Sequence, residues 1–222
     1  MTRVSAVVPV HGNEGTLEPL THRLAAVLTG YDWRLRFVVD ASPDGSAVVA
    51  SSLAARDPRV AVTTLDVNVG QHRALARGLA DEADADAWVC LDADLQDPPE
   101  AVPSLLRRLA VGDVAAVFAG RRGAYERRLR RWTGRLHRRA VAALTGLPPD
   151  AGAFLAMGGR ARDAVLAADA PSIVVAIGAS QLPVVSLPVA RDVRPVGRSA
   201  WDGRTRLSQS VRSLLWTARQ RS

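Results

Sequence analysis

Two aspartates one residue apart, Asp92 and Asp94, follow the apolar run Trp88–Leu91. We predict that this run is a buried strand. Because strand residues alternate between faces, both carboxylates would then point the same way. Two hard oxygen ligands on one side suit Mg²⁺ or Mn²⁺ bridging phosphates. The segment Asp97–Glu100 carries two prolines, which predict the end of the strand and the start of a helix. An isolated pair of this kind is also typical of a plain polar turn, so the rest of the chain must decide.

Strand patterns alternate with helix patterns over the first half of the chain. The apolar residues of the first helix recur at spacings of three and four, as an amphipathic helix requires. The strands are expected at Val4–Val10, Arg34–Asp40, Val60–Leu65, around Trp88–Leu91 and at Val114–Ala119, and the helices at Thr16–Leu28, at Ser46–Ala55 and from the Asn68 loop to about Ala80. This alternation predicts an α/β fold with a mostly parallel central sheet and helices on both faces.

Each of the first four strands ends in a polar or glycine-containing loop. In sheets of this kind, ligands bind at the carboxyl ends of the strands, so these loops should share one rim. The loops are Gly12–Glu14, Asp40–Gly45, Asn68–Gln71 and Asp92–Gln96, and the fifth strand leads into Gly120-Arg121-Arg122.

The second half of the chain is more basic and less regular. Tyr125–Leu144 is expected to be a helix with many arginines, which would form either a solvated face or a surface for an acidic membrane. Further expectations are a loop at Pro148–Phe154, strands at Ile173–Ile177 and Val184–Val189, a polar segment at Arg191–Trp201 and a basic amphipathic helix at Arg204–Arg221. No repeat or linker divides the chain, which predicts a single domain over 1–222.

Composition limits the class of protein. A length of 222 residues with 48% hydrophobic content suits one globular domain, and no window has the roughly 18 uncharged apolar residues that span a bilayer. No signal peptide is recognisable, so we expect a cytoplasmic location. The single Cys90 reads as a core residue. The net charge is +7, and all 29 basic residues are arginines. Arginines suit phosphorylated ligands or acidic surfaces, but GC-rich codon usage would also favour arginine over lysine.

Several segments together resemble the inverting glycosyltransferases of family 2, which have a GT-A (Rossmann-like) fold. The resemblance is greatest to the branch of dolichyl-phosphate mannose synthases and undecaprenyl-phosphate sugar transferases. It rests on motifs in the family's order: Val7–Val10, Asp40–Gly45, Asn68–His72, Leu91–Glu100, Asp150–Gly152 and Arg194–Ser199. It implies a single catalytic domain, with a nucleotide-sugar-binding half at 1–119 and an acceptor-side half at 120–222.

The resemblance also implies roles for individual residues. The donor, a GDP- or UDP-sugar, would be bound by Pro9, Val10, Glu14, Asp40, Asp92, Arg194 and Ser199; the Mg²⁺ or Mn²⁺ ion by Asp92, Asp94 and Gln96; the acceptor phosphate by Arg121, Arg130 and Arg131. Asp94, Asp150 and Arg121 are the candidate catalytic residues. The sequence departs from the family at Val39, where a second aspartate is frequent, and at Ala200, where lysine is common.

Three functions remain open from the sequence. The first is a metal-dependent transferase with a polyprenyl phosphate as the favoured acceptor and peripheral contact with the inner face of the membrane. The second is a tailoring transferase that acts on a hydroxyl group of a small molecule or protein, with Asp150 as the base. The third is a degenerate nucleotide-sugar binder. Nucleic-acid binding is disfavoured because aromatic residues make up only 5% of the chain.

Overall fold

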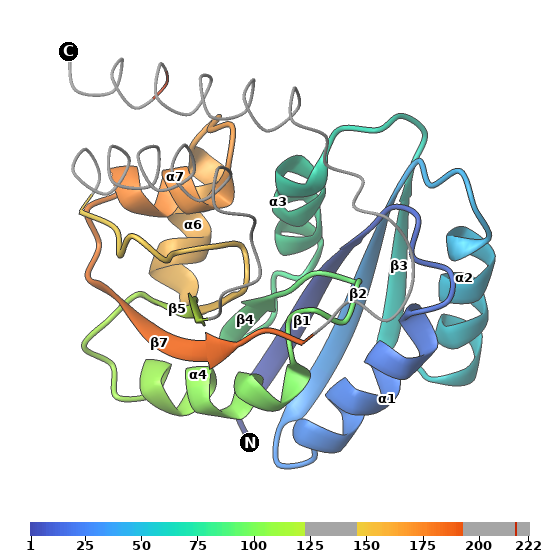
Figure 1. The fold of residues 1–222 in the computed structure, drawn as a ribbon, viewed down its shortest axis with the longest axis horizontal. Coiled ribbons are helices and arrows are strands. Elements are labelled where there is room, and N and C mark those ends of the chain that lie inside the picture. The colour runs from blue at the N-terminus through green and yellow to red at the C-terminus, as the bar shows by residue number, and fades with distance from the viewer. Residues whose placement is uncertain (123–145, 193–215, 217–222) are drawn as a thin grey trace.

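The central feature of the computed structural model, which describes residues 1–122, 146–192 and 216, is a twisted sheet (Figure 1). In this part of the chain the sheet has seven strands in the order β3-β2-β1-β4-β6-β5-β7. The strands are β1 Arg3–Val10, β2 Asp32–Asp40, β3 Val60–Leu65, β4 Ala87–Cys90, β5 Ala116–Arg122, β6 Leu155–Met157 and β7 Val184–Ala190. Only β6 among them runs antiparallel to its neighbours, so the carboxyl ends of the other six point to one edge.

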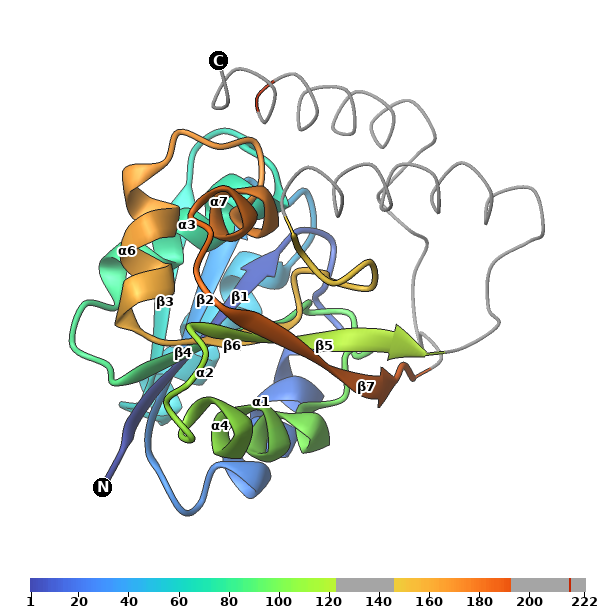
Figure 2. The ribbon, with the colours of Figure 1, turned by 90° about the vertical axis from the view of Figure 1, so that its left-hand side faces the viewer.

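Helices cover both faces of the sheet, as Figure 2 shows. On one face three helices pack on one hydrophobic cluster: α1 (Leu17–Val27), α2 (Ser46–Arg56) and α4 (Val102–Leu109). The 3₁₀ turn η1 (Pro99–Ala101) precedes α4. On the other face three helices pack on a second hydrophobic cluster: α3 (Gln71–Asp81), α6 (Gly159–Ala167) and α7 (Ile173–Ala179). Alternate residues of β1 divide between the clusters, as a strand buried on both faces requires.

The elements predicted for the first half of the chain are confirmed, with ends shifted by a few residues. One prediction in the second half is wrong, because Ile173–Ile177 is part of the helix α7 and not a strand. The Ser172 hydroxyl caps that helix by accepting the Val174 N–H at 3.2 Å. A short apolar run can form either a strand or a buried helix, and here the cap and the packing decide. The short strand β6 and the helix α6 were not predicted.

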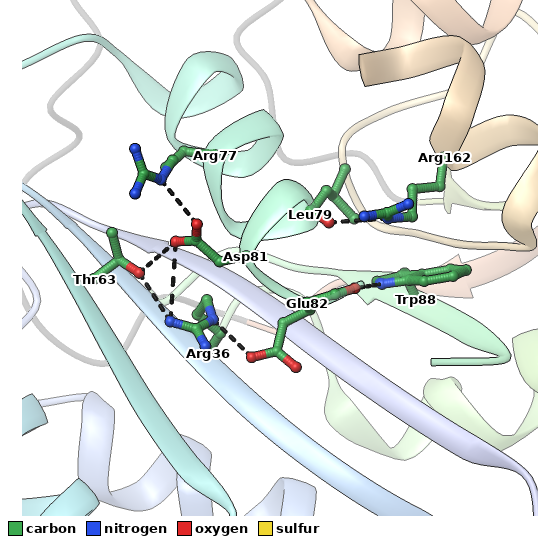
Figure 3. A network of polar contacts seen from close by, with 8 residues as sticks. All are labelled: Arg36, Thr63, Arg77, Leu79, Asp81, Glu82, Trp88 and Arg162. Carbon is green, nitrogen blue, oxygen red and sulfur yellow. Dashed lines mark hydrogen bonds and ion pairs between the residues drawn. The ribbon is translucent and has the colours of Figure 1, made fainter. Parts of the chain in front are cut away.

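The helix α3 lies very close to the sheet and is fixed at its carboxyl end. A Cβ on Gly78 would lie 2.4 Å from Val7 Cγ1 and 2.8 Å from Val38 Cγ2, so only glycine allows this approach. Arg36 of β2 donates from Nε to Glu82 Oε1 at 2.7 Å, within the polar network of Figure 3. This attachment helps to position the opposite end of α3, where Gln71 contacts Asp92 of the loop after β4.

Candidate active site

The loops after β1, β2, β3 and β4 lie at one edge of the sheet, as predicted, because these strands are parallel neighbours. Backbone N–H groups of the first loop donate to side chains of the second. Gly12 N–H donates to Ser42 Oγ at 2.8 Å, and Glu14 N–H donates to Asp44 Oδ2 at 3.1 Å. His11 Nδ1 lies 2.9 Å from the carbonyl oxygen of Asp40. The four loops therefore form a common rim.

Glu14, a predicted donor-binding residue, packs against the loop after β2. Its Oε2 accepts the Gly45 N–H at 3.0 Å, and its carboxylate occupies the space that a Cβ on Gly45 would need. Burial raises the pKa of the neighbouring Asp44, but hydrogen bonds from Ser42, Ser46 and the Glu14 N–H outweigh this and lower it to about 2. The Asp44 carboxylate is therefore charged at neutral pH and holds the two loops together.

Asp40, at the end of β2, is only 3% exposed. Its two carboxylate oxygens accept the N–H groups of Val69 and Gly70 at 2.7 and 2.8 Å. Gly70 has φ +87°, a backbone conformation that glycine adopts without strain. The carboxylate thus shapes the loop that starts α3. The adjacent Val39, at the position where the family often has aspartate, is buried in the core.

The loop after β4 carries the predicted metal ligands, but not on a strand. β4 ends at Cys90, so the prediction that Asp92 and Asp94 share a strand face is wrong. The loop turns instead through Leu95, whose φ is +60°. This turn forms because hydrogen bonds to side chains replace the sheet ladder: Asp94 Oδ1 accepts the Gln96 N–H at 3.0 Å.

Neighbouring elements fix the orientation of Asp92. Its Oδ1 accepts a hydrogen bond from Gln71 Nε2 of α3 at 2.5 Å, and its backbone N–H donates to Asp97 Oδ2 at 3.3 Å. Thr16 Oγ1, at the start of α1, donates to the carbonyl of Ala93 at 2.7 Å. The loop is thus held from both faces of the sheet.

The donor set of this loop fits a hard divalent cation. Asp92 and Asp94 supply carboxylate oxygens and Gln96 an amide oxygen, the ligand types that Mg²⁺ and Mn²⁺ favour with phosphates or water in the remaining positions. Within the described ranges, no group of three or more His, Cys, Asp or Glu side chains could hold a metal.

Of the other predicted donor residues, Pro9 and Val10 end β1; Val10 is fully buried in the core, and Pro9 is partly exposed.

Asp150 lies in a turn beside β5. A Cβ on Gly120 would lie 2.1 Å from Asp150 Oδ2 and 2.3 Å from Ser186 Oγ, so glycine leaves the space that the Asp150 carboxylate fills. Because β5 runs parallel to β4, Asp150 lies toward the same edge as the rim.

The remaining predicted residues are not placed. Arg130, Arg131, Arg194 and Ser199 lie outside the described residues, as do the two predicted basic helices apart from residue 216. Of Arg121 only the backbone, at the end of β5, is described. No helix in the described ranges is long and apolar enough to cross a membrane.

Three residues of the rim were not singled out from the sequence. Gln71 and Asp97 lie within the motifs Asn68–His72 and Leu91–Glu100, but neither is predicted to have a role of its own. Arg191 was counted in a polar segment, yet its Nε donates to Asp97 Oδ1 at 3.0 Å. Nothing in the local sequence around Arg191 signals a contact with a residue 94 positions earlier.

A mostly parallel sheet with an acidic loop at its carboxyl edge is typical of α/β proteins that bind nucleotides at this edge. The chain belongs to a particular family of that class: the sequence profile described as "Glycosyl transferase family 2" matches residues 5–164. The family predicted from the motifs is thereby confirmed.

Curated relatives include undecaprenyl-phosphate 4-deoxy-4-formamido-L-arabinose transferases. The protein from Pseudomonas fluorescens (strain SBW25) is 36% identical over 148 residues, which cover 65% of this chain and 42% of the relative. That from Pseudomonas aeruginosa (strain LESB58) is 37% identical over 148 residues, with 65% and 43% covered. The chain thus spans less than half the length of the curated relatives it matches.

The fold is similar to that of glucosyl-3-phosphoglycerate synthase from Mycobacterium tuberculosis. The structure of that enzyme with Mn²⁺, UDP-glucose and phosphoglyceric acid has a TM-score of 0.71 and 20% sequence identity, covering 97% of this chain and 79% of the other. Its complex with Mn²⁺, UDP and phosphoglyceric acid has a TM-score of 0.70, 18% identity and coverage of 99% and 78%. At these identities the similarity concerns the fold alone, and the predicted GT-A fold is confirmed.

Proposed function

We propose that this chain is the catalytic domain of a metal-dependent, inverting glycosyltransferase that moves a sugar from a UDP- or GDP-sugar to a polyprenyl phosphate. The observation that carries the proposal is the acidic loop at Asp92 and Asp94, held at the rim of a family 2 domain by Gln71 and Asp97. The named activity of the curated relatives supports the lipid phosphate as the acceptor.

The donor would lie across the rim with its diphosphate at the acidic loop. Asp92, Asp94 and Gln96 would hold a Mg²⁺ or Mn²⁺ ion, which supplies positive charge next to the departing diphosphate. Pro9 and Glu14 would border the nucleoside, and Asp40 would act through the loop that it shapes at Val69 and Gly70. Val10, which is fully buried, would contribute only by packing at the end of β1. Arg194 and Ser199 would close over the nucleotide.

In the proposed reaction an oxygen of the acceptor phosphate attacks the anomeric carbon from the side opposite the diphosphate. The bond from that carbon to the diphosphate oxygen breaks, its electron pair leaves with the diphosphate, and the configuration inverts. An ionised phosphate has no proton to lose, so this acceptor requires orientation and no strong base. Arg121, Arg130 and Arg131 would supply that orientation through two-point contacts with phosphate.

Replacing Asp94 tests the proposal. Asp94→Ala should lower turnover at least about 100-fold and remove the Mn²⁺ dependence of nucleotide binding, because the charge opposite the leaving group would be lost. Thermal unfolding should show that the variant is folded. Asp84→Ala, at an exposed position before β4 and therefore at the opposite edge, is the matched control and should leave both unchanged. Activity of Asp94→Ala at the wild-type level would refute the mechanism.

The acceptor requires a separate experiment. Contact between a basic surface and an acidic membrane weakens as salt rises, so sedimentation with anionic liposomes at low and high salt tests the peripheral membrane contact. Transfer of radiolabelled sugar to undecaprenyl phosphate, compared with transfer to hydroxyl acceptors, tests the substrate class directly. Nucleotide binding without transfer to any acceptor would instead support the degenerate binder.

The position of Asp150 favours a second candidate, transfer to a hydroxyl group. A hydroxyl acceptor must lose a proton, and a carboxylate toward the rim edge beside β5 could take it. Asp150→Asn distinguishes the candidates, since it should abolish transfer to a hydroxyl but spare transfer to a phosphate. Equal losses with both acceptors would show that Asp150 acts by positioning.

A further inference from the structure

Two hydroxyl groups in the described part of the chain are buried without a hydrogen-bond partner, those of Ser5 and Ser186. Most buried polar groups in folded proteins have a partner, because a buried donor or acceptor without one lowers stability. Ser5 lies in the first half of β1, away from the rim. Ser186 lies in β7, which pairs with β5. The two hydroxyls share their chemistry but differ in their distance from the candidate active site.

The register of the sheet places Ser186 level with the end of β4. Phe118 of β5 pairs with Ser186 on one side and with Leu155 of β6 on the other. Leu155 pairs in turn with Cys90, the last residue of β4. Gly120 follows Phe118 by two residues along β5 and so lies nearer still to the rim. Ser186 is therefore close to the level at which the chain enters the acidic loop.

The hydroxyl of Ser186 and the carboxylate of Asp150 meet above Gly120. A Cβ on Gly120 would lie 2.3 Å from Ser186 Oγ and 2.1 Å from Asp150 Oδ2, so the two oxygens are no farther apart than these two distances together. A movement of less than about 2 Å would bring them to the separation of an ordinary O–H···O hydrogen bond. The serine hydroxyl would then donate, and the carboxylate oxygen would accept.

We propose that Ser186 is a positioning residue for Asp150. When an acceptor is bound, the Ser186 hydroxyl donates to Asp150 Oδ2 and holds it over Gly120, which leaves Oδ1 to face the acceptor. Hydrogen bonds to charged groups are stronger than those between neutral groups, so the buried hydroxyl gains its partner in the reacting state. Ser186 makes no contact with the reacting atoms. The inference rests on the proposed function with either acceptor, since it requires only that Asp150 faces that acceptor.

Removing the hydroxyl tests this role. The acceptors are undecaprenyl phosphate and undecaprenol, which differ only in the phosphate, and the donor is UDP-glucose, or GDP-mannose if the wild type prefers it. Asp150→Asn first shows which acceptor depends on Asp150. With that acceptor, Ser186→Ala should lower kcat about tenfold and leave the KM for the donor within about twofold, because the hydrogen bond is made only in the reacting state. Ser186→Thr keeps the hydroxyl and should retain most of the turnover.

A double substitution shows whether Ser186 acts through Asp150. If it does, adding Ser186→Ala to Asp150→Asn should lower the remaining turnover by less than about twofold, because the pair is already broken. A further loss of about tenfold would show that the two residues act independently and would overturn the proposal.

Thermal unfolding separates this role from a purely structural one. Because no described residue hydrogen-bonds the Ser186 hydroxyl, Ser186→Ala should not lower the melting temperature. Ser5→Ala is the matched control, because it also removes a buried hydroxyl without a partner from a parallel strand. It should leave the melting temperature and the turnover unchanged. A decrease of more than about 3 °C in Ser186→Ala would show that the hydroxyl already holds the fold together and would overturn the proposal.

The remaining outcomes separate this inference from the proposed function. Full turnover in Ser186→Ala, with an acceptor whose transfer Asp150→Asn impairs, would overturn the role of Ser186. Full turnover of Asp150→Asn with both acceptors would overturn it too, since Asp150 would then have no role that depends on its position. Failure of the wild type to bind UDP or GDP with Mn²⁺, or to transfer sugar to either acceptor, would instead refute the proposed function.

Discussion

Asp40 combines a predicted donor-binding role with a clear structural one, and Asp40→Asn measures the structural part. The carboxylate accepts two backbone N–H groups at 2.7 and 2.8 Å in a site that is 3% exposed. Asparagine has one acceptor oxygen, so its NH₂ group would face the Val69 or the Gly70 N–H. Hydrogen bonds to a charged group contribute roughly 1.5–3 kcal/mol each, and an unsatisfied buried donor costs roughly 1–3 kcal/mol. We expect a loss of about 3 kcal/mol in the free energy of unfolding.

The assay is thermal and urea unfolding of the domain without nucleotide. For a chain of this length, about 3 kcal/mol corresponds to a decrease of roughly 10 °C in melting temperature. Asp66→Asn is the matched control, because Asp66 is an exposed carboxylate just after β3, and it should change the melting temperature by no more than about 2 °C. A melting temperature of Asp40→Asn equal to that of the wild type would refute the reasoning and would assign Asp40 to ligand binding alone.

Two further predictions concern α3. Gly78→Ala should destabilise the domain by about 2 kcal/mol in urea unfolding. The clash of the new Cβ with two buried valines at 2.4 and 2.8 Å outweighs a gain of about 1 kcal/mol in helix propensity. Gly159→Ala is the control and should not destabilise the domain, because a Cβ there meets nothing within 4 Å. Burial lowers the pKa of His72 to about 4, so the unfolded chain takes up this proton first as the pH falls. Because the His72 side chain is partly exposed, we expect roughly 1–2 kcal/mol of the stability present above pH 6.5 to be lost by pH 4. His72→Gln should flatten the plot of unfolding free energy against pH between pH 6.5 and pH 4, whereas substitution of the exposed His22 by glutamine should not. A plot unchanged by His72→Gln would contradict the assignment of this pH dependence to His72.

Local patterns were sufficient for most of the first half of the fold. The spacing of Leu17, Leu20 and Leu24 and the apolar strands predicted the elements up to α4, because periodicity reports directly which face is buried. The common rim also followed from sequence, since parallel strands joined by helices must end at one edge. The motif at Asp92 could be assigned to that rim without coordinates.

The tertiary structure decided what depends on contacts distant in sequence. Ile173–Ile177 is a helix because the face of α3 is there to pack against, a contact that the apolar run itself does not encode. The cap by the adjacent Ser172 is local and adds to this preference. The three-residue strand β6 exists only because β4 and β5 provide partners for its backbone.

The sequence by itself determined the family, the fold class and the acidic pair at Asp92 and Asp94, because short motifs in a fixed order carry that information. Only the structure showed that the pair lies in a turn, that Gln71 and Asp97 orient it, and that Arg191 joins it to the end of β7. The physical reason is that a buried carboxylate such as Asp97 requires a counter-charge but does not specify where in the chain that charge must come from.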